Sequence, residues 1–109
     1  MTDARTAKIR QLNDEFRKHF PANGRRYITD GIFAFSDDDR DVILQKVREF
    51  DSFGEDNDPH GEHDFGSFEY KGERIFWKID TYDAAARYGS EDPSDPAKTC
   101  RVLTITLAL

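Results

Sequence analysis

Apolar residues recur every three or four positions near the start of the chain. Between residues 4 and 20 this spacing is kept by Ile9, Leu12, Phe16 and Phe20. It places the apolar side chains on one face of a helix, while charged residues occupy the rest of the surface. Pro21 and the Asn23-Gly24 pair that follow are typical of a helix end and a turn. The pattern therefore predicts an amphipathic helix over residues 4–20 that packs on a core.

A second helix is indicated after residue 36. The segment YITDGIFAF, residues 27–35, is rich in β-branched and aromatic side chains and predicts a strand. Ser36 is a good N-cap, and three aspartates follow it in the first turn, where the helix dipole favours negative charge. We expect this helix to run to about Asp51 and to bury Ile43, Val47 and Phe50, with Leu44 at the edge of the stripe.

Alternation replaces the helical spacing in the second half of the chain. Residues 53–64 are rich in turn formers and predict a loop. Residues 65–70 and 73–80 flank Lys71-Gly72, which suits a two-residue hairpin turn. On the second arm the two-residue period assigns Ile75, Trp77 and Ile79 to the core. The last strand is predicted within residues 99–109, where Leu103, Ile105, Leu107 and Leu109 share one face.

The order of elements predicts the fold class. It reads helix, strand, helix, long loop, hairpin, loop and strand, with no repeat or linker that would divide the chain. We expect a single domain over residues 1–109, of the α+β class, in which an antiparallel sheet of about four strands carries two helices packed on one face.

Composition fits a folded protein of the cytoplasm. Apolar residues make up 37% and charged residues 35% of the 109 residues, and the aromatic ones fall within the periodic segments. Cys100 is the only cysteine, so an internal disulfide is excluded. No apolar stretch approaches the roughly 18 residues of a membrane span. We therefore expect a soluble, cytoplasmic protein without a membrane partner.

Charge is distributed unevenly along the chain. Residues 1–26 carry a net charge of +4, so the remainder carries −10 of the total of −6. Seven carboxylates occur between residues 51 and 70 with no Lys or Arg among them: Asp51, Glu55, Asp56, Asp58, Glu62, Asp64 and Glu69. Acidic residues also gather at 91–95. Such a field disfavours direct binding of nucleic acid and favours a basic partner protein.

The segment HGEHD, residues 60–64, is the candidate for metal or acid–base chemistry. His60 and His63 are three residues apart with Gly61 between them, whereas strong zinc motifs place two histidines on one helical face at i and i+4. His60, His63 and Asp64 are thus weak metal candidates, and we assign no metal, cofactor or catalytic residue. His63 beside two carboxylates keeps an acid–base or metal-dependent enzyme open as the alternative.

Several segments together resemble a domain-of-unknown-function family of small proteins from proteobacteria, their plasmids and phages. They are VREFDSF (47–53), NDPHGEHDFGSFEYKGERIFWKIDTYD (57–83), YGSEDPSDP (88–96) and RVLTITLAL (101–109). The resemblance is concentrated in an N-D-P-x-G-E-H-D-F-G block: Asn57, Asp58, Pro59, Gly61, Glu62, His63, Asp64, Phe65 and Gly66. His60 falls at the variable position, which leaves His63 as the better candidate. The resemblance implies no reaction, but a mobile-element setting implies an interaction or counter-defence role.

The sequence therefore favours a protein that works by binding. We expect the acidic surface around residues 51–69 and 91–95 to face a basic partner protein, in the sharper form a nucleic-acid-binding protein whose ligand the carboxylates mimic. The oligomeric state is left open. His63 is expected to lock its loop onto the hairpin.

Overall fold

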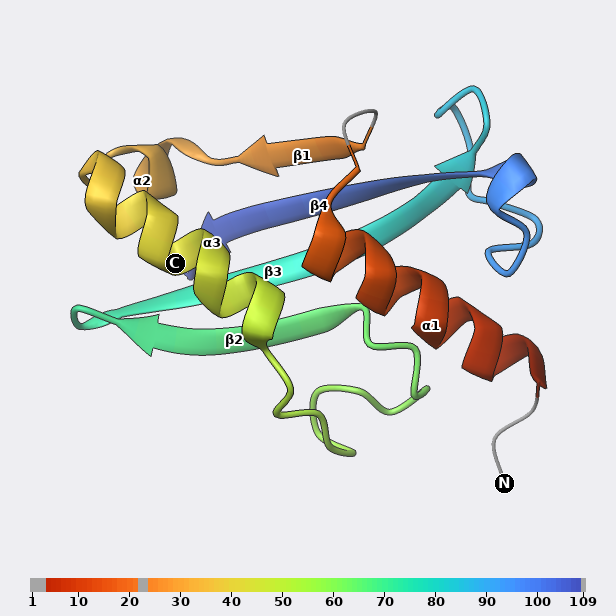
Figure 1. The fold of residues 1–109 in the computed structure, drawn as a ribbon, viewed down its shortest axis with the longest axis horizontal. Helices are drawn as coiled ribbons and strands as arrows, with labels where there is room; N and C mark the ends of the chain where they lie inside the picture. Colours follow the sequence, from red (N-terminus) through yellow and green to blue (C-terminus); the bar gives the residue numbers. More distant parts are fainter. Residues whose placement is uncertain (1–3, 22–23, 109) are drawn as a thin grey trace.

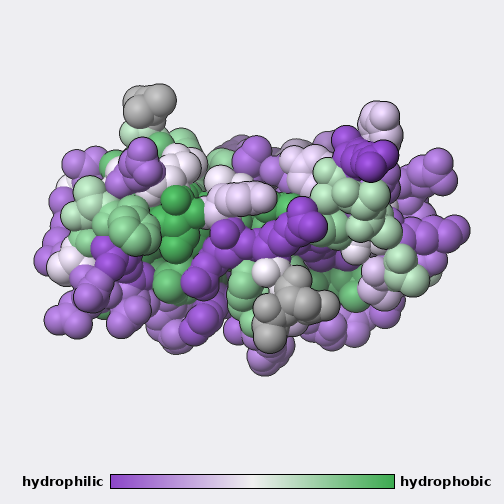
Figure 2. Space-filling view, turned by 90° about the horizontal axis from the view of Figure 1, so that it is seen from above, coloured by the Kyte–Doolittle hydropathy of each residue, from purple (hydrophilic) through white to green (hydrophobic). Residues whose placement is uncertain are grey.

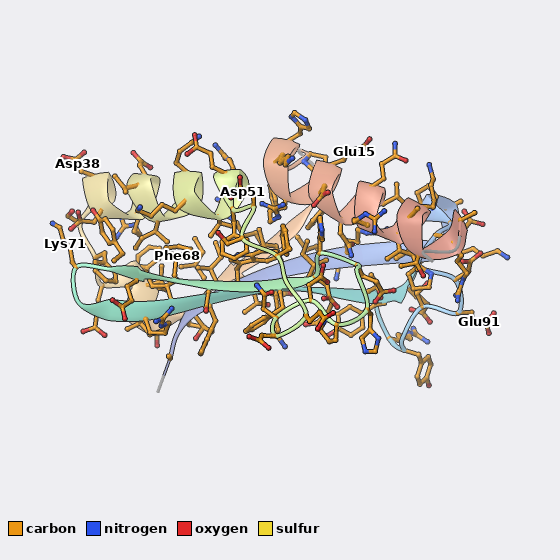
Figure 3. The ribbon with its side chains drawn as sticks, turned by 90° about the horizontal axis from the view of Figure 1, so that it is seen from below. Glu15, Asp38, Asp51, Phe68, Lys71 and Glu91 are labelled. Carbon is orange, nitrogen blue, oxygen red and sulfur yellow. The ribbon has the colours of Figure 1, made fainter. Side chains whose placement is uncertain are left out.

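The computed structural model, which describes residues 4–21 and 24–108, is a four-stranded sheet with its two longer helices on one face (Figures 1 and 3). The elements are α1 (Ala4–His19), β1 (Arg25–Ile28), α2 (Asp30–Phe33), α3 (Asp37–Glu49), β2 (Phe65–Tyr70), β3 (Glu73–Asp83), η1 (Pro96–Lys98) and β4 (Thr99–Leu107). The strand order is β1-β4-β3-β2. The expected α+β class is confirmed.

The sheet is mixed and mostly antiparallel. Strands β2, β3 and β4 pair in antiparallel fashion, while the edge strand β1 runs parallel to β4 with Arg25 opposite Val102. A parallel neighbour requires a crossover connection, and here α2, α3 and the hairpin supply it. Hydrophobic alternation is the same in either direction, so the sequence pattern did not reveal this orientation.

The predicted strand over residues 27–35 is wrong in its second half. The strand ends at Ile28, and Thr29 begins a helical turn, α2, that buries Ile32 and exposes Phe33. Ile28, Ile32 and Phe35 are spaced as on a helix, not as on a strand. A Cβ on Gly31 would lie 2.6 Å from Cδ1 of Leu107, so this glycine lets α2 sit directly on β4.

Helix α1 buries a different stripe from the one predicted. It begins and ends close to the expected bounds, and Ile9 and Phe16 are buried, but the other two buried residues are Asn13 and Arg17, each 1% exposed. Leu12 is only partly buried. Asn23, assigned to the turn after the helix, lies outside the described residues. Polar side chains therefore occupy the interface between α1 and the rest of the molecule.

The hairpin follows the sequence prediction, whereas Phe50, predicted to be buried in the second helix, lies just after the end of α3 at Glu49 and is only partly buried. Lys71 and Gly72 have φ values of 50° and 80°, as a type I′ turn requires, and Ile75, Trp77 and Ile79 are at most 5% exposed. Trp77 lies under Phe50, which contacts it edge-on at 5.5 Å between ring centroids. A Cβ on Gly66 would lie 2.6 Å from Nε1 of Trp77 and 2.7 Å from the Phe50 ring. The glycine at this strand position is thus explained by the two rings that press on it.

Helix α3 starts as predicted. The Ser36 side chain accepts a hydrogen bond from the backbone N–H of Asp39 at 3.1 Å. Asp39 has a further role, because its carboxylate accepts bonds from the Tyr70 hydroxyl and the Lys71 ammonium at 2.6 and 3.1 Å. These bonds hold the pKa of Asp39 below its usual value. The start of α3 is thereby joined to the hairpin turn, close to the labelled Lys71 and Asp38 in Figure 3.

None of the helices within residues 4–21 and 24–108 has both the length and the apolar content needed to cross a bilayer.

Candidate functional site

The loop between α3 and β2 is held against α1. Nη1 of Arg10 donates to the carbonyl of Gly61 at 3.1 Å, and Nδ2 of Asn13 donates to the carbonyl of Glu62 at 3.0 Å. Oδ1 of Asn13 in turn accepts from Nε of Arg101 on β4 at 2.8 Å. Two loop carbonyls are therefore satisfied by side chains of a helix about 50 residues away in sequence. The acidic loop has a defined conformation as a result.

His63 fastens the same loop through its ring. Its Nδ1 lies 2.9 Å from Oδ1 of Asp14, and its Nε2 lies 3.5 Å from Oδ2 of Asp58. The ring stacks on Phe53 with 3.7 Å between centroids and 4° between planes. Both ring nitrogens thus face carboxylates and one ring face is covered. His63 anchors the loop to α1 and to Phe53. The sequence had instead predicted that His63 locks the loop onto the hairpin.

His63 also adopts an unusual backbone conformation. Its φ is 54°, in the left-handed region that few residues other than glycine occupy. The backbone N–H of His63 donates to Oδ1 of Asp58 at 3.0 Å, which stabilises the turn. The side chain of Asp58 is only 5% exposed. Its carboxylate therefore contacts both the ring Nε2 and the backbone N–H of His63.

Arg17 lies beneath the loop and was missed by the sequence prediction. Its Nη1 donates to the carbonyls of Val47, Arg48 and Phe50 at 2.7 to 3.1 Å, and its Nη2 pairs with Asp14 at 3.1 Å. The guanidinium also lies 4.9 Å above the Trp77 ring. Burial lowers the pKa of Arg17, while the Asp14 carboxylate opposes this shift. The sequence feature that could have identified Arg17 is its position on the same face of α1 as Ile9, eight residues later.

The carboxylates of the predicted partner surface divide into four groups. Asp51, Glu55 and Asp56 are exposed and make no ion pair with a described residue. Asp58 is turned inward to His63. Glu69 lies apart on β2 and pairs with Arg74 at 3.1 Å.

Glu62 and Asp64 form the fourth group, and both are partly buried. Burial raises the pKa of each carboxyl, and repulsion adds to it, from Asp64 and Asp58 at Glu62 and from Asp58 and Asp80 at Asp64. Neither forms an ion pair within the described part of the chain. Negative charge therefore accumulates here without a compensating Lys or Arg in contact.

The acidic segment 91–95 is used within the molecule. Oδ1 of Asp92 pairs with Arg5 of α1 at 3.3 Å and accepts from the Ser94 hydroxyl and N–H, and these bonds lower the pKa of Asp92. The side chain of Asp95 accepts from the N–H of Ala97 at 2.9 Å and caps η1. This segment therefore offers fewer unpaired charges than the sequence suggested.

The weak metal candidates are not brought together. His60 is exposed, and both nitrogens of His63 face Asp14 and Asp58. Across residues 4–21 and 24–108, no group of three or more His, Cys, Asp and Glu side chains is arranged to hold a metal ion. The acid–base alternative built on His63 stays a prediction.

The fold and the site define a small α+β protein whose acidic loop is fastened to its first helix. The chain belongs to the family described as Protein of unknown function (DUF3768), whose model matches residues 28–109. The match includes the acidic loop, the hairpin and β4, and it begins after α1. No curated protein and no solved structure matches the chain.

Proposed function

We propose that this protein acts by binding a basic partner protein through its acidic loop surface, which we define as Asp51, Glu55, Asp56, Glu62 and Asp64. The observation that carries the proposal is the partly buried pair Glu62 and Asp64, which make no ion pair within the described residues and whose pKa values are raised by burial and by neighbouring carboxylates. A Lys or Arg side chain from a partner would relieve that repulsion by pairing with the carboxylates.

The geometry of the loop favours recognition. A flexible acidic loop would lose conformational freedom on binding, and that loss weakens affinity. Here Arg10, Asn13 and His63 already hold the loop in one conformation, through bonds of 2.9 to 3.1 Å to Gly61, Glu62 and Asp14. Its carboxylates are therefore presented at fixed positions before the partner arrives.

The chemistry of the surface narrows the class of partner. Carboxylates at fixed positions repel phosphates and can imitate them. The partner that matches this surface is therefore a protein that itself binds nucleic acid. We place this activity in the cytoplasm and, from the N-D-P-x-G-E-H-D-F-G block, in proteobacterial mobile elements such as phages and plasmids. There it would act as an inhibitor that occupies the nucleic-acid site of its target.

Capture of the partner tests the proposal with matched variants. The wild-type protein, immobilised without a histidine tag, is incubated with an extract of the bacterial host. The loop variant Glu55→Gln with Asp56→Asn removes two exposed charges, and Asp38→Asn with Asp41→Asn removes two from the exposed surface of α3. We expect a basic protein to be retained by the wild type and the α3 variant and to be at least fivefold depleted with the loop variant, because each lost pair contributes to a steered encounter.

Salt and nucleic acid supply the mechanistic readouts. Raising the salt from about 50 to about 300 mM should slow association, because the Debye length shortens. Duplex DNA should compete with the protein for the captured partner. The proposal is wrong if affinity is independent of salt, if the two double variants behave alike, or if no basic protein is retained.

A further inference from the structure

We propose that the cleft between α1 and the start of β4 is a binding site for a small organic anion, with a carboxylate or phosphate group on Arg101 and an apolar body against α1. The cleft has a volume of about 700 Å³. It is lined by Leu12, Phe16 and His19 of α1, by Arg25 of β1, and by Pro96 and Arg101 near the other end. It is separate from the acidic loop surface, so the two proposals stand or fall independently.

The charge of Arg101 carries the inference. Arg101 is only 8% exposed, and burial lowers its pKa with no opposing carboxylate. Its bonds go to neutral oxygens, Oδ1 of Asn13 at 2.8 Å and the carbonyl of Pro93 at 2.5 Å. No carboxylate of a described residue lies within ion-pair distance of it. A buried arginine without a counter-ion at the wall of a cleft is a ready partner for an oxyanion.

A comparison with Arg17 sharpens this point. Both arginines are buried and both bond to backbone carbonyls. Arg17, however, has the Asp14 carboxylate at 3.1 Å, and it is enclosed beneath the loop. Arg101 has the cleft where Arg17 has a carboxylate. An anion bound in the cleft would give Arg101 the kind of partner that Arg17 already has in the Asp14 carboxylate.

The other walls of the cleft indicate what the anion is attached to. Arg25 and His19 add basic groups, whereas Glu15 is tied at 3.2 Å to Gln11 on the surface of α1. Leu12, Phe16 and Pro96 offer apolar surface to a ring or a short chain. The volume lies in the range of pockets that hold small molecules, about 300 to 1,000 Å³. Figure 2 looks onto the β1 edge of the sheet and shows hydrophobic and hydrophilic surface side by side along it.

Titration with simple probes tests the site. Phenyl phosphate, benzoate and the neutral benzyl alcohol are added to the ¹⁵N-labelled full chain, and amide shifts are followed by NMR. We expect either anion to shift the amides of residues 12–19 and 99–101 with a Kd of about 1 mM, a reasonable affinity for ligands of this size. Benzyl alcohol should bind at least tenfold more weakly. Tighter binding of phenyl phosphate assigns the cleft to phosphate esters, and tighter binding of benzoate assigns it to carboxylic acids.

Two variants separate the site from general attraction. Arg25→Gln removes an exposed charge that lines the cleft, while Arg26→Gln removes the neighbouring exposed charge, which is not among the lining residues. We expect Arg25→Gln to weaken binding at least fivefold and Arg26→Gln less than twofold. Arg101→Lys keeps the charge but loses the planar fork, and should weaken binding about tenfold while the fold is retained.

Three results would overturn the inference. The first is that the cleft amides do not shift with either anion at about 10 mM, well above the expected Kd. The second is that benzyl alcohol binds as tightly as the anions. The third is that Arg25→Gln and Arg26→Gln weaken anion binding equally.

Discussion

At the scale of single residues, Arg17 shows how a charged side chain can act as a structural centre. The carbonyls of Val47, Arg48 and Phe50 at the end of α3 all accept from this one guanidinium, and the Val47 carbonyl also accepts from the Phe50 N–H at 3.4 Å. The same group pairs with Asp14, which holds Nδ1 of His63. One side chain thus connects the end of α3, helix α1 and the acidic loop.

Replacing Arg17 should therefore be costly. We expect Arg17→Met to lower the free energy of unfolding by about 3–5 kcal/mol, because three carbonyls at the end of α3 and the Asp14 carboxylate lose a charged donor together. Urea unfolding followed by the fluorescence of Trp77, the only tryptophan, measures it. Lys18→Met is the control, since this exposed neighbour loses the same charge and should change stability by less than about 0.5 kcal/mol. Equal effects of the two substitutions would contradict the role given to Arg17.

The same residue marks what the sequence could not predict. Ile75, Trp77 and Ile79 were assigned correctly because alternation depends only on the strand itself. Asn13 and Arg17 were missed because a polar residue is buried only when partners distant in sequence satisfy it, here Arg101, Glu62 and the end of α3. The His63 loop was recognised as a candidate, but its attachment to α1 depends on the same long-range contacts.

At the scale of elements, close packing sets the path of β2. Gly66 brings the β2 backbone under Trp77 and Phe50, which in turn positions the loop that ends at Asp64. The carbonyl of Asp64 accepts from the N–H of Ile79 at 2.8 Å and extends the pairing of β2 with β3. A glycine in the interior of a strand, weak on propensity grounds, is favoured here by the bulk of its neighbours.

A methyl group at this position should disturb the core. We expect Gly66→Ala to destabilise the fold by about 1–3 kcal/mol, because its Cβ would overlap Trp77 and Phe50. Gly54→Ala is a matched control within the loop, where a Cβ would meet nothing within 4 Å. Thermal unfolding of both variants checks the prediction, and a Gly66→Ala protein as stable as the Gly54→Ala protein would refute it.

The element scale also explains the error at residues 27–35. Composition alone favoured a strand, since both short strands and buried helical turns are rich in Ile and Phe. The deciding contacts are tertiary: Thr29 donates its N–H to the carbonyl of Ile105 at 3.1 Å, and Gly31 allows the close approach of Leu107. These contacts turn the chain out of β1 and towards α3.

At the scale of the whole molecule, the fold places basic side chains next to acidic segments. The basic helix α1 contacts both acidic segments, through Arg10 at Gly61 and through Arg5 at Asp92. Arg5 thereby pairs with a carboxylate of the acidic part of the chain, and Arg10 binds a carbonyl of the acidic loop. The five carboxylates of the acidic loop surface make no ion pair within the described residues, which is why we place the partner there.

The pH dependence of stability should reflect this arrangement. Glu62 and Asp64 have pKa values raised above 4.5 and 3.8, so the folded state binds their protons more tightly than the unfolded state does. Stability should rise as the pH falls from 7 through the raised values. Asp39 and Asp92 have pKa values lowered from 3.8, so their ionised carboxylates stabilise the folded state. That contribution is lost only as the pH falls below 3.8.

Urea unfolding between pH 7 and pH 3 checks this order. We expect a stability maximum on the acidic side of neutrality, and a Glu62→Gln, Asp64→Asn double variant more stable than wild type at pH 7 but not at pH 4. A wild type that only loses stability below pH 7 would contradict the assignment.

The parallel pairing of β1 with β4 has a consequence for the order in which the chain can fold during synthesis. Arg25 and Val102 are neighbours in the sheet but are separated by most of the chain. The β2–β3 hairpin needs only local residues, so it can close while the ribosome is still translating. Of the four strands, β1 leaves the exit tunnel first, yet its pairing partner β4 is not available until residues 99–107 have followed. Strand β1, translated before the other three strands, is thus among the last to join the sheet.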